Sequence, residues 1–171
     1  MKGPEPGEEN HTSMNSQQLL NKIDKAWADL QESYAGLSGA ELVAPGANGD
    51  WSVKDILAHV TTWEEETLRD LPLIAAGETP PEDAGYGSLD SFNAQKMAQK
   101  RDLAPEEVLR QLDAVHARLR DYVQSVPEEH FTRETPFRRR LRFDTYSHYP
   151  AHARMIREWR AAREVLAPPA G

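Results

Sequence analysis

The amino-acid sequence predicts an all-α protein, a four-helix bundle, and three observations support that fold class. Apolar residues recur every three or four positions through most of the chain, which is the helical period. We find no convincing two-residue alternation of the kind that marks a half-buried strand. Four of the predicted helices are long, and one extended connection at 77–88 is rich in proline, glycine and acidic residues. Bundles of this kind build metal sites from side chains that project inward from facing helices.

The first two helices are predicted from their apolar stripes and from a capping motif. The first covers about residues 16–37, and its stripe is Leu19, Ile23, Trp27, Leu30, Tyr34 and Leu37. The second is expected to begin at Ser52, because Ser52 and Asp55 have the spacing of a capping box. Trp51 can pack against Ile56 as a hydrophobic staple. This helix is expected to end near residue 76, before Gly77.

Three further helices follow the connection. They are predicted at about residues 89–100, 105–125 and 145–166. Pro105 suits a first helical position, which needs no backbone donor. Pro150 lies inside the last helix, so we expect a kink or a late start there. The stretch 126–142 contains Pro127, Pro136 and several arginines, and we expect it to be mostly loop.

Composition restricts the compartment and the partners. With 171 residues, the chain is long enough for one domain with its own core, and we expect tails at 1–13 and 168–171 around a bundle at 14–167. The chain has no apolar run of the roughly 18 residues that cross a bilayer and no secretory signal, so we expect a cytoplasmic protein without a membrane partner. The net charge of −8 argues against a nucleic-acid partner. Because cysteine is absent, any metal must be held by His, Asp, Glu or water.

Three histidines are the strongest candidates for a functional site. His148 and His152 are four residues apart, so they share one face of a helix. A third imidazole, His59, lies on the apolar side of the second predicted helix. Together they would form a three-histidine metal site with an open coordination position. The alternatives are a core histidine bonded to a carbonyl and a chance pair on an exposed face. The remaining histidines are not expected on apolar faces: His11, His116 and His130.

The motifs around these histidines resemble those of the DinB-like (YfiT-like) four-helix-bundle superfamily. The similar segments are Trp51-Ser-Val-Lys-Asp-Ile-Leu-Ala-His59-Val-x-x-Trp63-Glu64, Asp90-Ser-Phe-Asn93 and Asp144-x-Tyr146-x-His148-Tyr149-x-x-His152-Ala-x-x-Ile156-x-x-Trp159. The pattern is most similar to the ClbS/DfsB branch and extends over residues 15–166. The resemblance implies an up-down-down-up bundle with a long crossover connection. It also implies a divalent metal, usually zinc or nickel, on His59, His148 and His152.

The resemblance leaves the reaction open. It implies a metal-dependent thiol transferase or hydrolase, in which a metal-bound water or thiol attacks a small electrophilic molecule. A low-molecular-weight thiol is an expected cofactor of the transferase. The alternative is a ClbS-like protein that binds or sequesters a small toxic molecule, as in self-resistance, without metal-dependent turnover. Dimers are common in the family, so a homodimer is also left open.

Two carboxylates near His59 are candidates for helping the metal site. Glu66 lies about two helical turns after His59, and Asp55 lies one turn before it. Either carboxylate could orient an imidazole or act as a base. The alternative for each is a solvated carboxylate on a helix surface.

Polar and basic residues elsewhere are candidates for substrate binding. Asn93 and Tyr149 are expected to line the pocket, with plain packing or capping as the alternative. Arg138, Arg139 and Arg140, followed by Arg142, form a basic run that leads into the last helix. These guanidinium groups could bind the carboxylates of an anionic substrate or thiol. As a solvated loop, the run would need no function.

Overall fold

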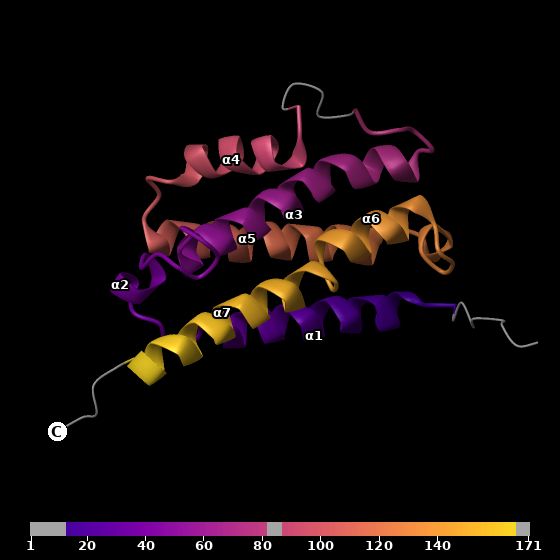
Figure 1. Cartoon of the computed structure of the whole chain (residues 1–171). Helices are drawn as coiled ribbons and strands as arrows, with labels where there is room; N and C mark the ends of the chain where they lie inside the picture. Colours follow the sequence, from indigo (N-terminus) through magenta and orange to yellow (C-terminus); the bar gives the residue numbers. More distant parts are fainter. Residues whose placement is uncertain (1–12, 82–86, 167–171) are drawn as a thin grey trace, which may run out of the picture.

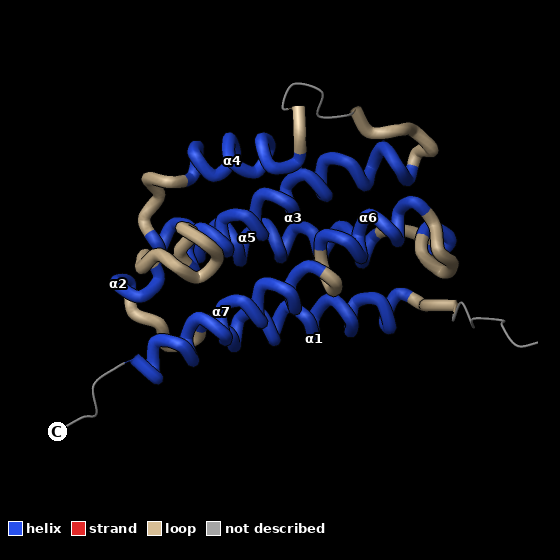
Figure 2. Tube along the Cα trace, in the orientation of Figure 1, coloured by secondary structure: helices blue, strands red, loops and turns tan. Residues whose placement is uncertain are grey.

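A computed structural model describes residues 13–81 and 87–166 of the chain, and these residues form a helical bundle (Figures 1 and 2). The helices are α1 (Ser16–Tyr34), α2 (Gly39–Leu42), α3 (Val53–Ala75), α4 (Leu89–Lys100), α5 (Pro105–Ser125), α6 (Pro136–Asp144) and α7 (His148–Leu166), with a 3-10 turn at Glu128–His130. These described residues contain no strand, so the predicted all-α class is confirmed. Apart from Ser13, the predicted tails at 1–13 and 168–171 lie outside the described residues.

The four long helices are arranged in the predicted up-down-down-up order. Figure 1 shows α1 and α7 running in one direction and α3 and α5 in the other. α7 packs mainly along α1, and α3 packs mainly along α5 and α6. α4 lies against α3 and belongs to the long connection from α3 to α5, which is the predicted crossover. None of the described helices is both long and apolar enough to cross a lipid bilayer.

The predicted apolar stripes supply the core. Leu19, Ile23 and Leu30 of α1 are fully buried, as are Ile56 of α3 and Leu112 of α5. Burying one such side chain typically stabilises a fold by about 1.5–3 kcal/mol. These residues carry no metal-binding group, so the bundle has a source of stability that is independent of any ion.

The starts of α3 and α7 follow from their sequences. Ser52 and Asp55 form the predicted capping box, in which the Ser52 backbone N–H donates to Asp55 Oδ2 over 2.9 Å. α7 begins at His148, so the late start expected from Pro150 is confirmed. Pro150 lies in the first turn, where a backbone N–H has no intrahelical acceptor and its loss costs little.

The prediction that 126–142 is mostly loop was wrong for its second half. α6 begins at Pro136, a first helical position that suits proline, and Thr135 caps it by accepting from the Arg138 backbone N–H over 3.1 Å. Phe137 and Leu141, four residues apart, are both buried and attach the helix to the core. The arginines therefore lie on a helix rather than in a flexible loop.

Candidate metal centre

Three imidazoles converge where α3 meets α7. Nε2 of His148 lies 3.2 Å from Nε2 of His59 and 2.8 Å from Nε2 of His152. One ring nitrogen from each residue lies within 4.8 Å of the other two. α3 supplies His59, and successive turns of α7 supply the other two. We call these three residues the histidine triad.

Burial controls the charge of the histidine triad. His59 and His152 are 8% and 6% exposed. Burial, reinforced by the neighbouring imidazole of His148, lowers the pKa of each of these two residues to about 3. Burial also lowers the pKa of His148 to about 4, although the Asp144 backbone partly opposes that shift. All three rings are therefore neutral near pH 7, which is the form that donates a lone pair to a metal.

The donor set fits a divalent cation. Metal–nitrogen bonds of about 2.0–2.1 Å in tetrahedral geometry separate the ligand nitrogens by about 3.3 Å. The separations of 3.2 and 2.8 Å are close to that value. A hydrogen bond between two Nε2 atoms needs one protonated and one bare nitrogen, whereas a cation satisfies three lone pairs together. Imidazole ligands suit zinc, nickel, copper and iron.

Two tryptophan rings flank His59. The ring centre of Trp51 lies 5.3 Å from that of His59, and the ring centre of Trp63 lies 6.4 Å from it. The Trp63 indole N–H donates to Asn93 Oδ1 over 3.1 Å. The guanidinium carbon of Arg140 lies 5.8 Å from the centre of the Trp63 ring. The predicted binding residues Asn93 and Arg140 are therefore linked to the triad through Trp63.

The two predicted helper carboxylates have other partners. Asp55 Oδ2 accepts from the Ser52 hydroxyl over 2.8 Å as part of the helix cap. Glu66 is buried and forms ion pairs with Arg69 at 2.5 Å and with Lys96 at 3.2 Å. Capping and ion pairing thus account for both side chains in this structure.

Tyr149, predicted to line the pocket, belongs to a second buried cluster. Its side chain is fully buried, and its hydroxyl donates to Glu64 Oε1. Nδ1 of His116 lies 2.8 Å from the same oxygen. The Trp27 ring stacks on the His116 ring, with parallel planes and centres 3.6 Å apart. We call Trp27, Glu64, His116 and Tyr149 the Glu64 cluster.

The expectation that His116 lies off the apolar face was wrong, because it is only 6% exposed. The charges of Arg118 and Arg120 suggested an exposed position. The signal in the sequence was the spacing of His116 from the buried residues of its own helix. Leu112, His116, Leu119 and Val123 follow one another at intervals of four, three and four residues, which is a core stripe.

The predicted basic run is largely paired with acids. Arg138, Arg139 and Arg142 lie 3.7, 4.0 and 2.8 Å from carboxylate oxygens of Glu134. Arg140 instead lies 3.1 Å from Asp70 and 3.0 Å from Asp144, and we call these three residues the Arg140 cluster. Burial raises the pKa of Asp144 to about 6, although Arg140 opposes that shift.

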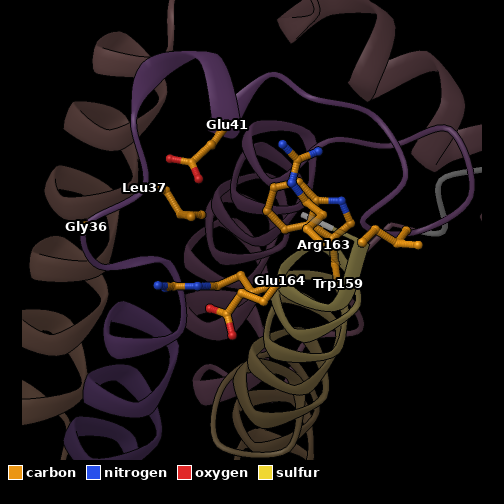
Figure 3. Close-up of a pocket in the computed structure, with 8 residues that line it drawn as sticks. Gly36, Leu37, Glu41, Trp159, Arg163 and Glu164 are labelled. Atoms are coloured by element: carbon orange, nitrogen blue, oxygen red, sulfur yellow. The ribbon is translucent and has the colours of Figure 1, made fainter. Parts of the chain in front are cut away.

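A separate cavity of about 520 Å³ lies between α7, α2 and the connection that joins α1 to α2 (Figure 3). Its lining residues are Gly36, Leu37, Glu41, Trp159, Arg160, Arg163, Glu164 and Leu166. The guanidinium carbon of Arg163 lies 4.8 Å from the Trp159 ring centre, so this cation covers part of the aromatic surface. None of these lining residues is a predicted site residue, so the cavity is distinct from the histidine triad.

Three imidazoles that converge between two helices of an up-down-down-up bundle fit the predicted DinB-like class, and sequence comparison agrees with it. The chain belongs to the DinB superfamily, whose sequence profile matches residues 22–164. The predicted superfamily is therefore confirmed. No curated protein matches this sequence.

Three solved structures illustrate the shared fold. The colibactin self-resistance protein ClbS, solved in complex with double-stranded DNA, is 16% identical with a TM-score of 0.72, over 84% of this chain and 94% of ClbS. DfsB, a sibling lethal factor precursor, is 16% identical with a TM-score of 0.74, over 88% of this chain and 97% of DfsB. An uncharacterised protein from Escherichia coli UTI89 is 18% identical with a TM-score of 0.72, over 88% and 95% of the two chains. ClbS and DfsB are thus both structurally similar to this chain, as the expected branch predicts.

The expectation of no nucleic-acid partner was wrong as an inference from charge. It rested on the net charge of −8. ClbS has the same fold, and its structure contains double-stranded DNA. Net charge describes the whole molecule, whereas binding depends on how charge is distributed over one surface. Net charge alone therefore does not decide whether a protein of this fold binds nucleic acid.

Proposed function

We propose that this protein binds a divalent metal ion through Nε2 of His59, His148 and His152, and that it is a metal-dependent thiol transferase or hydrolase acting on a small electrophilic molecule. The convergence of three neutral imidazoles, two of them buried and that of His148 partly buried, supports this proposal most. Zinc and nickel are the expected ions, and a low-molecular-weight thiol is the expected second substrate of a transferase. A divalent ion in such a site acts as a Lewis acid and lowers the pKa of the water or thiol that it binds.

The chain's own residues prepare this site in two ways. Burial keeps the imidazoles neutral, so that their lone pairs are available at physiological pH. Trp51 and Trp63 place apolar surface beside His59, which limits water and strengthens electrostatic interactions nearby. Asn93 and Arg140 adjoin Trp63 and are our candidates for contacting a polar or anionic part of the substrate. We assign no catalytic base, because Asp55 and Glu66 are engaged elsewhere.

Metal content is the first test of this proposal. Protein purified without a nickel column should contain about one zinc or nickel ion per chain by elemental analysis, or take up that amount after reloading. His130→Ala changes a histidine in the 3-10 turn outside the triad, so this control variant should contain or take up as much metal as the parent. The proposal would be contradicted if the parent protein neither contained nor took up a divalent ion.

Turnover then separates an enzyme from a sequestering protein. The metal-loaded protein is assayed with 1-chloro-2,4-dinitrobenzene plus cysteine or glutathione for thiol transfer, and with 4-nitrophenyl acetate for hydrolysis. Chelation should abolish whichever activity is present. Ligand binding that survives chelation, with no turnover in either assay, would favour the alternative of a small-molecule sequestering protein. Because the ClbS structure contains DNA, a DNA duplex is titrated into the same samples as a separate binding assay.

A further inference from the structure

The Glu64 cluster receives one side chain from each long helix of the bundle. Trp27 comes from α1, Glu64 from α3, His116 from α5 and Tyr149 from α7. Glu64 and Tyr149 are 0% exposed. Both hydrogen-bonding partners of Glu64, the Tyr149 hydroxyl and the His116 ring, meet the same carboxylate oxygen, Oε1. The cluster is therefore a buried polar junction that joins all four long helices.

This junction connects the same two helices that carry the histidine triad. On α3, Glu64 follows His59 by five residues, and on α7, Tyr149 is adjacent to His148. The hydroxyl of Tyr149 thus ties α7 to α3 within about two helical turns of the imidazoles. α7 packs mainly along α1 and has few contacts with α3, so few other interactions fix its register against α3 directly.

Stability alone does not explain the Glu64 cluster. A buried carboxyl group is costly, and its second oxygen, Oε2, has no hydrogen-bond partner in the described part of the chain. An apolar cluster of similar size would often be as stable or more stable. Hydrogen bonds are directional, however, and a shift of α7 by one turn, about 5.4 Å, would break the Tyr149 bond. The same shift would leave the Glu64 carboxyl group buried with one partner fewer.

We propose that Glu64, His116 and Tyr149 are positioning residues, which hold α7 against α3 in the register at which the three imidazoles converge, before any ion binds. This inference rests on the proposed function, because it assigns the register a purpose in metal binding. The three residues act through the placement of the helices and do not contact the ion. Loss of the Tyr149 bond should therefore loosen the metal-free site as well as weaken metal binding.

The metal-free protein provides the first test. Cysteines introduced as Glu65→Cys on α3 and Arg154→Cys on α7 carry spin labels, since both positions are exposed and the native chain has no cysteine. Electron paramagnetic resonance then gives the distance distribution between α3 and α7. Tyr149→Phe should broaden this distribution. Ser33→Ala, which also removes only a buried hydroxyl, should leave it unchanged.

Cobalt binding provides the second test. Cobalt(II) reports ligand geometry through its d–d absorption, which is strongest at four-coordinate sites. In the protein without labels, Tyr149→Phe should lower cobalt affinity about 10–100-fold and weaken this absorption. Ser33→Ala should match the parent. Glu64→Gln keeps the size and the acceptor oxygen, so it should retain both the affinity and the absorption, and it serves as a second variant.

The possible outcomes separate this inference from the proposed function. Parental distance distribution and cobalt affinity in Tyr149→Phe would overturn the inference. A loss of affinity with an unchanged distribution would also overturn it, because the effect would not pass through helix position. If the parent itself fails to bind cobalt, the proposed function fails, while the distance measurement still shows whether Tyr149 sets the register of α7.

Discussion

The bundle contains two kinds of buried polar cluster. In a matched cluster, acidic groups are paired with basic groups, and in the other kind they are not. The Glu64 cluster sets a carboxyl group against an imidazole, and the Arg140 cluster sets a guanidinium group against two carboxylates. The histidine triad instead brings three bases into contact with one another. Histidine occurs in both kinds of cluster, so residue type alone does not decide its role.

The difference shows what each cluster still needs. In a matched cluster each acid has a basic partner within the protein, so the cluster needs no added cation. The triad has no such partner, and burial moves its three pKa values down to about 3–4. Those shifts record the cost of protonating the rings where they lie. A metal cation would bring positive charge to these lone pairs without a proton, which is why we propose the triad as the metal site.

The largest expected effect comes from removing one base of the triad. His152→Ala should lower zinc or cobalt affinity by more than about 100-fold, because a directly bound imidazole contributes at least as much as its supporting residues. The helical circular dichroism should persist, because the apolar core holds the bundle together. Affinity is measured by competitive titration, with His130→Ala as the control. Loss of most helical signal after chelation of the parent would instead assign the metal a structural role.

A substitution in a matched cluster should change the stability of the fold rather than the affinity for metal. Arg140→Met leaves the buried carboxylate of Asp144 without the cation that pairs with it, while Asp70 retains its ion pair with Arg69, and the loss should destabilise the fold by roughly 3 kcal/mol. Arg139→Met is the control, because its side chain is 65% exposed and such charges contribute less than about 1 kcal/mol. Denaturant titration measures both variants. Equal midpoints in the two variants would show that the Arg140 cluster does not depend on its cation.

Acidification should distinguish the triad from the matched clusters in metal-free protein. The pKa of His152 is lowered from 6.5 to about 3 on folding, so below pH 6.5 the unfolded chain binds a proton that the folded chain excludes. Stability from this residue is therefore complete above pH 6.5 and is lost as pH falls toward 3. The loss should be about 1–2 kcal/mol at pH 5. Asp144 opposes it, because its raised pKa of about 6 favours proton uptake by the folded state.

The variant His152→Gln isolates the contribution of the imidazole. Urea midpoints are measured at pH 7 and pH 5 with chelator present, in parent and variant. Asp144 is common to both proteins, so its effect largely cancels in the difference. The parent should lose more stability than the variant between these two values of pH. Parallel changes would mean that burial does not suppress protonation of His152.

Some features of this protein can be predicted from local sequence patterns, and others depend on how the helices pack. The bundle follows from the helical period, and the shared face of His148 and His152 follows from their four-residue spacing, which are local patterns. His59 lies 89 positions before His148, and only its apolar helix face and the family resemblance placed it with them. The start of α6 is harder to predict, because proline disfavours the interior of a helix but suits its first position, where Pro136 lies. The bond between Glu64 and Tyr149 joins residues 85 positions apart, so only the packed helices bring them together.

The smallest effect is expected from the exposed side of α6, where the ion pairs between arginine and glutamate lie at the protein surface. Arg139 and Arg142 have side chains 65% and 42% exposed, and both pair with Glu134. Replacing both with glutamine, while keeping Arg140 intact, should change stability by less than about 1 kcal/mol. If this surface attracts an anionic substrate or thiol, the Michaelis constant should rise a few-fold at low salt and less at high salt, where ions screen the charges.

The control is Arg154→Gln, which changes an exposed arginine of α7. A Michaelis constant that is equal in parent and variant at both ionic strengths would leave these arginines a solvated helix surface. Charge matching at the surface would then have no bearing on the site, because only buried groups lack water as an alternative partner.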